Sequence, residues 1–150
     1  MKLSFKECIE KKKIFPFEPA RQLVSLELED AKEDLKSAEE DYDQGNFKWA
    51  TIKGYYSMFH SARALLYSRG YREKGHYCLY LAIRAFFVRE KKLDPKLAED
   101  FNNSMILRED ADYRRKFSQE GAQAVIESAK RFLKAAKQIL LKEQGENHDY

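Results

Sequence analysis

The sequence predicts an all-α protein: an antiparallel bundle of four main helices plus a short N-terminal helix. Its 150 residues are enough for one domain with its own core. Only three prolines and six glycines are present, too few for the frequent turns of a sheet protein. Long segments repeat apolar residues every three or four positions, and the connections between them are short. We expect residues 1–143 to form this domain and residues 144–150 to be a flexible polar tail.

The short first helix is predicted by a capping box, in which Ser4 and Glu7 satisfy each other's backbone N–H groups. It ends before "FPFEP", because proline cannot continue a helix. The first long helix should begin near Pro19 and end at Gly45. Its apolar stripe consists of Val24, Leu28, Ala31, Leu35, Ala38 and Tyr42.

The next helix, 46–70, carries apolar residues on two faces, which predicts neighbours on two sides and a central position. Small residues at 50, 54, 57 and 61 would allow a close helix approach, and Gly70 should end the helix. The next helix, predicted over 76–92, is apolar nearly all round. We expect part of that surface to face a second subunit, making the protein a homodimer.

The last helices have clear start signals. Asp94 is a predicted N-cap followed by Pro95 at the first helical position, and Asn102–Asn103 is expected to interrupt or bend the helix that follows. Ser118 should open the final helix. The stripe of that helix is Ala122, Val125, Ala129, Phe132, Ala136 and Ile139.

The charge balance bears on nucleic-acid binding, and the cysteines bear on the cellular compartment. A net charge of +3, from 28 basic and 25 acidic residues, does not favour non-specific coating of duplex DNA. Cys8 and Cys78 form no CxxC pair and no disulfide framework, which favours a reducing compartment. We see neither a signal peptide nor an apolar run long enough for a membrane span, so the expected location is the cytoplasm.

Common catalytic signatures are missing: the chain has no GxGxxG, P-loop, HExxH or GxSxG motif. We predict no cofactor and no metal. His76 and Cys78 are two residues apart on a helix and point to different faces, so they make a poor zinc pair. For His60 we expect a buried, hydrogen-bonded imidazole on the apolar side of the central helix.

The turn "SRGYREKGHY" holds the best candidates for chemistry, Arg69 and His76. A helix-end reversal could bring both side chains into one pocket. Arginine can fork onto phosphate oxygens, and histidine can exchange protons near neutral pH, which together suit cleavage of an RNA phosphodiester without metal. The ordinary alternative is an arginine favoured by the carbonyl end of a helix and a solvated turn histidine.

The run "WATIKGYYSMFHSARALLYSRGYREKGH", followed by "LREDADY", resembles the HEPN domain family, in particular its small single-domain prokaryotic members. The resemblance implies a helical bundle, commonly dimeric, and in many members a metal-independent ribonuclease. Such members use an arginine, four to six intervening residues and a histidine, a motif that falls on Arg69 and His76. Family members often act as the toxin beside a small nucleotidyltransferase antitoxin.

Two positions depart from the active family pattern: Gly70 follows the arginine where a polar residue is usual, and Cys78 stands where modified toxins carry a tyrosine. In "LREDADY", a surface ion pair between Arg108 and Asp112 is expected, and these residues together with Tyr113 are predicted to be structural. The aromatics of the central helix could stack bases but are more often core.

Three functions therefore stay open. The first is an RNA-acting or nucleotide-binding HEPN protein, with His76 as general acid/base and Arg69 as the phosphate-binding residue. The second is a non-catalytic module that binds a nucleotidyltransferase or a nucleotide. The third is a helical scaffold with no site.

Overall fold

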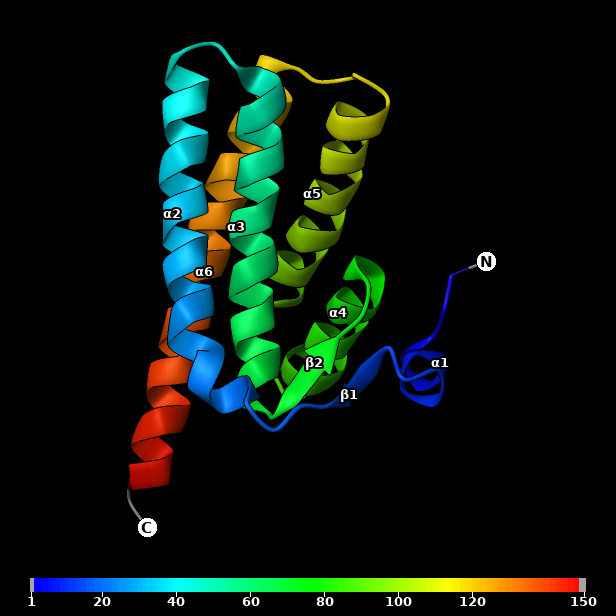
Figure 1. Ribbon diagram of the computed structural model, residues 1–150. Coiled ribbons are helices and arrows are strands. Elements are labelled where there is room, and N and C mark those ends of the chain that lie inside the picture. Colours follow the sequence, from blue (N-terminus) through cyan, green and yellow to red (C-terminus); the bar gives the residue numbers. More distant parts are fainter. Residues whose placement is uncertain (1, 149–150) are drawn as a thin grey trace.

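Four long helices lie side by side in the computed structural model, which describes residues 2–148 (Figure 1). They are α2 (Val24–Asp43), α3 (Phe47–Ser68), α5 (Pro95–Tyr113) and α6 (Gln119–His148), and successive long helices run in opposite directions. A smaller layer beside one end of the bundle holds α1 (Phe5–Glu10), the strands β1 (Ile14–Pro16) and β2 (Tyr71–Glu73), and α4 (His76–Ile83). The all-α bundle with a short N-terminal helix is confirmed.

Local signals fix most helix ends as expected. Ser4 and Glu7 form the predicted capping box, and the Asp94 carboxylate accepts a hydrogen bond from the backbone N–H of Lys96. Gly45 and Gly70 follow α2 and α3 with φ of +80° and +82°, a conformation that costs glycine little. One start is displaced: Pro19 caps a short 3₁₀ turn (η1, Ala20–Leu23), and α2 begins only at Val24.

Helix α3 is the centre of the bundle, as the two-sided apolar pattern predicted. It packs against α2, α5 and α6, and its small residues allow the close approach to α6. A Cβ added at Gly54 would lie 2.9 Å from a side-chain carbon of Val125 in α6. The helices can therefore meet at this distance because position 54 has no side chain.

The sequence did not predict the two-stranded sheet, in which β1 pairs antiparallel with β2 and Ile14 lies opposite Glu73. Segment 76–92 is also different from expectation, since α4 ends at Ile83 and continues as a π-helical segment, η2 (Arg84–Val88). Its large apolar side chains are mostly buried within this chain, so the apolar pattern does not by itself require a second subunit. The fully or nearly fully buried ones are Leu79, Tyr80, Ile83 and Phe87.

Helix α5 runs without interruption through Asn102 and Asn103, so the predicted break there is wrong. Helix α6 continues through residue 148, which makes residues 144–148 of the expected tail helical backbone; residues 149–150 lie outside the described residues. None of the helices in the described chain is long and apolar enough to cross a bilayer.

The cysteines correct a further expectation, because Cys8 and Cys78 form a disulfide across 70 residues of sequence. No motif marks the pair, since the fold alone brings α1 against the first turn of α4. Both residues are buried, and the bond fixes the N-terminal segment next to His76.

Candidate functional site

Arg69 lies at the C-terminal end of α3, where its guanidinium is already engaged. It contacts the carboxylates of Glu143 at 2.8 Å and Glu90 at 3.4 Å, and it lies 4.5 Å from the centre of the Phe87 ring. Burial raises the pKa of Glu143, but hydrogen bonds from Arg69 and Lys92 outweigh this and lower it below its ordinary value. The pair therefore stays ionised and ties the end of α3 to α6.

His76 opens α4 and lies against the middle of α3. Its Nδ1 is 2.6 Å from the Tyr55 hydroxyl, and its ring packs on Tyr55 and Phe59. Burial, with the nearby guanidinium groups of Arg108 and Arg63, lowers the pKa of His76 to about 4. Burial also keeps the Tyr55 phenol protonated, because it raises the pKa of that group against the opposing effect of Arg108. The site thus holds a neutral imidazole at neutral pH.

The structure does not bring Arg69 and His76 together within one chain. His76 contacts Tyr55, which lies about 21 Å from Arg69 along the axis of α3 at 1.5 Å per residue. Strand β2 runs back along α3 and carries the chain away from Arg69 before α4 begins (Figure 1). Among the described residues, no polar contact joins the two side chains.

The arginines near His76 are instead Arg63 of α3 and Arg108 of α5. Arg63 is paired with Glu73 and Glu27, whereas Arg108 packs on aromatic rings. The guanidinium carbon of Arg108 lies 5.3 Å from the centre of the Tyr55 ring and 5.7 Å from that of Tyr56. Only 5% of Arg108 is exposed, so the expected surface ion pair with Asp112 is in fact half buried, with the charged atoms 3.7 Å apart. The segment packs against the central helix, since α5 and α3 are in contact.

The accessible part of His76 faces a cavity of about 370 Å³ between the N-terminal segment, α4 and α5. Lys2, Lys13 and Lys74 also line this cavity, and among the described residues that line it Glu109 is the acidic one. The cavity has a basic rim around a neutral imidazole, an arrangement that suits a polyanion.

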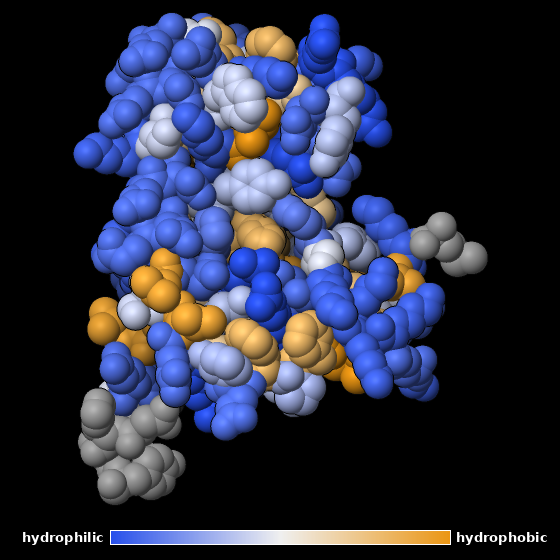
Figure 2. Space-filling view, in the orientation of Figure 1, coloured by the Kyte–Doolittle hydropathy of each residue, from blue (hydrophilic) through white to orange (hydrophobic). Residues whose placement is uncertain are grey.

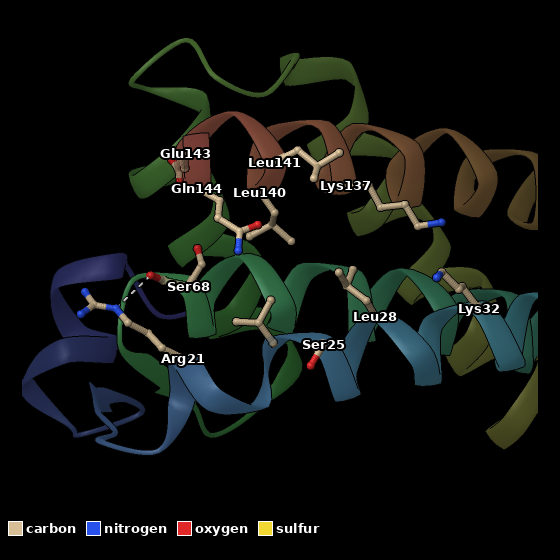
Figure 3. A pocket seen from close by; sticks show the side chains of 11 residues that line it. Arg21, Ser25, Leu28, Lys32, Ser68, Lys137, Leu140, Leu141, Glu143 and Gln144 are labelled. Atoms are coloured by element: carbon tan, nitrogen blue, oxygen red, sulfur yellow. Dashed lines mark hydrogen bonds between the residues drawn. The ribbon is translucent and has the colours of Figure 1, made fainter. Parts of the chain in front are cut away.

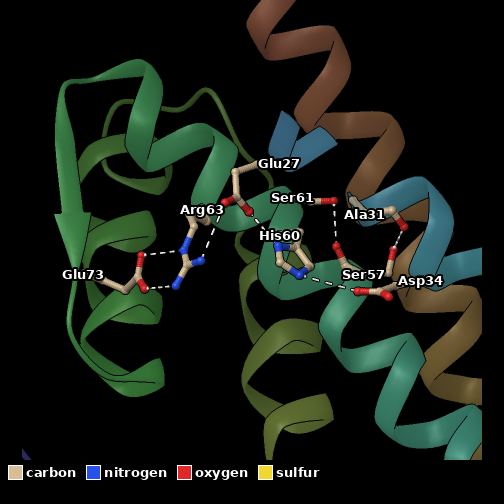
Figure 4. A network of polar contacts seen from close by, with 8 residues as sticks. All are labelled: Glu27, Ala31, Asp34, Ser57, His60, Ser61, Arg63 and Glu73. Atoms are coloured by element: carbon tan, nitrogen blue, oxygen red, sulfur yellow. Dashed lines mark hydrogen bonds and ion pairs between the residues drawn. The ribbon is translucent and has the colours of Figure 1, made fainter. Parts of the chain in front are cut away.

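His60, on α3, belongs to a separate polar network that links α2 and α3 to β2 (Figure 4). It is hydrogen-bonded as predicted, with Nδ1 2.6 Å from Glu27, but its side chain is 20% exposed and not fully buried. Burial tends to lower the pKa of His60, yet the hydrogen bond that its ring donates to Glu27 and the charges of Glu27 and Asp34 raise it above its ordinary value. Arg63 joins Glu27 to Glu73.

A metal could in principle find ligand atoms of Glu27, Asp30 and His60 within 4.8 Å of one another. Glu27 already serves two cationic side chains, because Arg63 lies 3.6 Å from it and the hydrogen bond to Glu27 holds His60 towards its protonated form. This donor set fits an ion-pair network that fastens α2 to α3 better than it fits a cation site.

A shallow pocket of about 560 Å³ lies between the start of α2, the end of α3 and the end of α6 (Figure 3). Leu28, Leu140 and Leu141 give it an apolar wall, and Lys32 and Lys137 stand at one end. Figure 2 shows apolar side chains exposed over this end of the molecule, where Leu26 and Leu141 are 59% and 69% exposed. The pocket has the character of a contact surface.

Comparison with known proteins defines the class. The model of the HEPN domain family matches residues 24–140, and the chain therefore belongs to this family. Two similar proteins come from Methanocaldococcus jannaschii. "Putative toxin MJ0605" is 30% identical over 125 residues, covering 80% of this chain and 93% of that protein. "Putative toxin MJ0142" is 29% identical over 140 residues, covering 90% and 95%.

Sequence reasoning missed Arg108 as a member of the site, although a signal was present. The apolar stripe of α5 is Ala98, Phe101, Met105 and Ala111, and Arg108 occupies the position within that stripe where another apolar residue belongs. A charge at a core position of an amphipathic helix is a recognisable sign of a buried polar function.

Proposed function

We propose that this protein is a toxin-like HEPN protein that cleaves RNA without a metal, with His76 as the proton-transfer residue. One observation carries the proposal: a neutral imidazole lines an open cavity with three lysines. The HEPN family and the two similar proteins named as putative toxins support the same class.

In this mechanism the Nδ1–H of His76 donates to the Tyr55 hydroxyl, which leaves Nε2 free as a base. Nε2 takes the proton of a ribose 2′-OH, whose oxygen bonds to phosphorus while the bond to the 5′-oxygen breaks. Water protonates the leaving 5′-oxygen, and the His76 imidazolium returns its proton to the hydroxide that this leaves. The products are a 2′,3′-cyclic phosphate and a 5′-hydroxyl end, and the rim lysines hold the phosphates of the strand.

The test is cleavage of labelled single-stranded RNA and tRNA by the purified protein in EDTA. We expect cleavage with cyclic-phosphate ends, its loss in His76→Asn, and its retention in the matched variant His60→Asn. DNA of the same sequence should remain intact because it lacks the 2′-OH. Absence of cleavage by folded wild-type protein refutes the proposal, and equal cleavage by His76→Asn removes His76 from it.

The second candidate is a non-catalytic HEPN module that binds a minimal nucleotidyltransferase or a nucleotide. The observation in its favour is that Arg69, the arginine of the family motif, is engaged by two carboxylates and lies away from His76. The apolar pocket with Leu26 and Leu141 beside it would then be the partner surface. Copurification with a coexpressed nucleotidyltransferase, lost in Leu141→Asp, tests this role.

The proposal includes a cytoplasmic homodimer, in which two sites serve one RNA. Sedimentation of the purified protein tests the dimer. In a reducing cytoplasm Cys8 and Cys78 would be present as thiols for part of the time, so the cleavage assay should be run with and without reductant.

A further inference from the structure

Arg108 is a buried cation with few partners. It is 5% exposed, and its Nε atom has no hydrogen-bond partner among the described residues. One Nη1 contact of 3.3 Å goes to the Tyr113 hydroxyl, and the Asp112 carboxylate lies 3.7 Å away, beyond hydrogen-bond distance. A guanidinium carries five N–H donors, so most of its hydrogen-bonding capacity is unused.

Such a group is costly for a folded chain, because a buried charge is normally paired and hydrogen-bonded. The rings of Tyr55, Tyr56 and Tyr113, each less than 6 Å away, offset part of this cost through cation–π attraction. They offer no hydrogen-bond acceptor for Nε. The environment holds the guanidinium in place while leaving its donors for an anion.

The position of Arg108 relates it to the proposed site. Tyr55 and Tyr56 each pack against both Arg108 and His76, so the guanidinium and the imidazole share two aromatic neighbours. A phosphate beside His76 and a phosphate bound by Arg108 can therefore belong to one RNA strand.

Tyr113 covers the guanidinium and can move. It is 72% exposed and is the last residue of α5, so its ring can leave Arg108 without disturbing the core. Once displaced, an exposed phenol ring is also a surface on which a base can stack.

We propose that Arg108 is the phosphate-binding residue of this protein, with Tyr113 as a movable cover that stacks on a base of the same strand. This role rests on the proposed function and replaces the one expected for Arg69. Asp112 competes with the phosphate for the guanidinium in the free protein.

The experiment measures binding without cleavage, using a fluorescent 2′-O-methyl RNA oligonucleotide in EDTA over a series of salt concentrations. For Arg108→Gln we expect the slope of log affinity against log salt to fall by about 0.7, equivalent to about a fivefold loss of affinity at 0.1 M salt. Arg108→Lys should keep the slope. The control Arg131→Gln removes an equal charge from an exposed site on α6 and should change neither quantity.

A second comparison does not depend on the stability of Arg108→Gln. Asp112→Asn should bind more tightly than wild type, and more tightly than Asp110→Asn, an equal charge change on the same helix at a carboxylate paired with Arg114. Equal affinities for the two variants, or an unchanged salt slope in folded Arg108→Gln, overturn the role of Arg108. If the role of Arg108 is overturned in this way but wild type still cleaves RNA, the proposed function stands without Arg108. If wild type neither cleaves nor binds RNA, the proposed function itself fails.

Discussion

The titration of His76 should make the stability of this protein depend on pH. The imidazole has a pKa of about 4 in the folded chain and about 6.5 in the unfolded chain. Between these values the unfolded state binds more protons, so stability is full above about pH 6.5 and is lost as pH falls towards 4. The pKa difference sets a ceiling of about 3 kcal/mol, and solvent around the half-buried ring reduces this to about 1–2 kcal/mol.

His60 contributes with the opposite sign, because its pKa is raised in the folded chain by the carboxylates of Glu27 and Asp34 against the effect of burial. Its contribution is present below about pH 6.5 and is lost as pH rises through its folded pKa. The pH dependence of the stability of wild type therefore combines the contributions of His60 and His76. The difference between wild type and His76→Asn isolates His76, since His60 is present in both proteins.

The assay is urea denaturation followed by circular dichroism at several pH values from about 7 to about 4. Relative to His76→Asn, wild type should lose about 1–2 kcal/mol over this range, and the variant His60→Asn should retain that loss. A difference between wild type and His76→Asn that stays constant with pH would refute both the burial of the imidazole and the neutral base of the proposed mechanism.

Three further variants test other parts of the structure. Gly54→Ala should lose about 1–3 kcal/mol in urea denaturation, because its methyl group would lie 2.9 Å from a valine side chain of α6, whereas Gly145→Ala, with nothing within 4 Å, should be no less stable. Cys8→Ser should lose about 3–4 kcal/mol, since the disulfide closes a loop of 70 residues; reductant should weaken wild type equally and leave the variant unchanged. Arg69→Gln should lose about 1 kcal/mol of stability but keep RNA cleavage, and a loss of cleavage as complete as that in His76→Asn would contradict the separation of the two residues.

The sequence by itself determined the helices and their central member. The spacing of apolar residues, the caps at Ser4 and Asp94 and the glycines at 45 and 70 are local signals. Local backbone preferences and the burial of one helix face are enough to form helices with these ends. The family resemblance likewise depended on contiguous residues, and the family match over residues 24–140 confirmed it.

Only the tertiary structure decided which charged groups share a site. Strand β2 has three residues and forms because β1 lies beside it, and its course along α3 carries His76 away from Arg69. Likewise, Cys8 meets Cys78 and Arg108 meets Tyr55 only through packing between elements distant in sequence. Spacing along a chain fixes distances within one helix. Contacts between helices, and with them the burial that shifts the pKa of His76, depend on how the whole bundle closes.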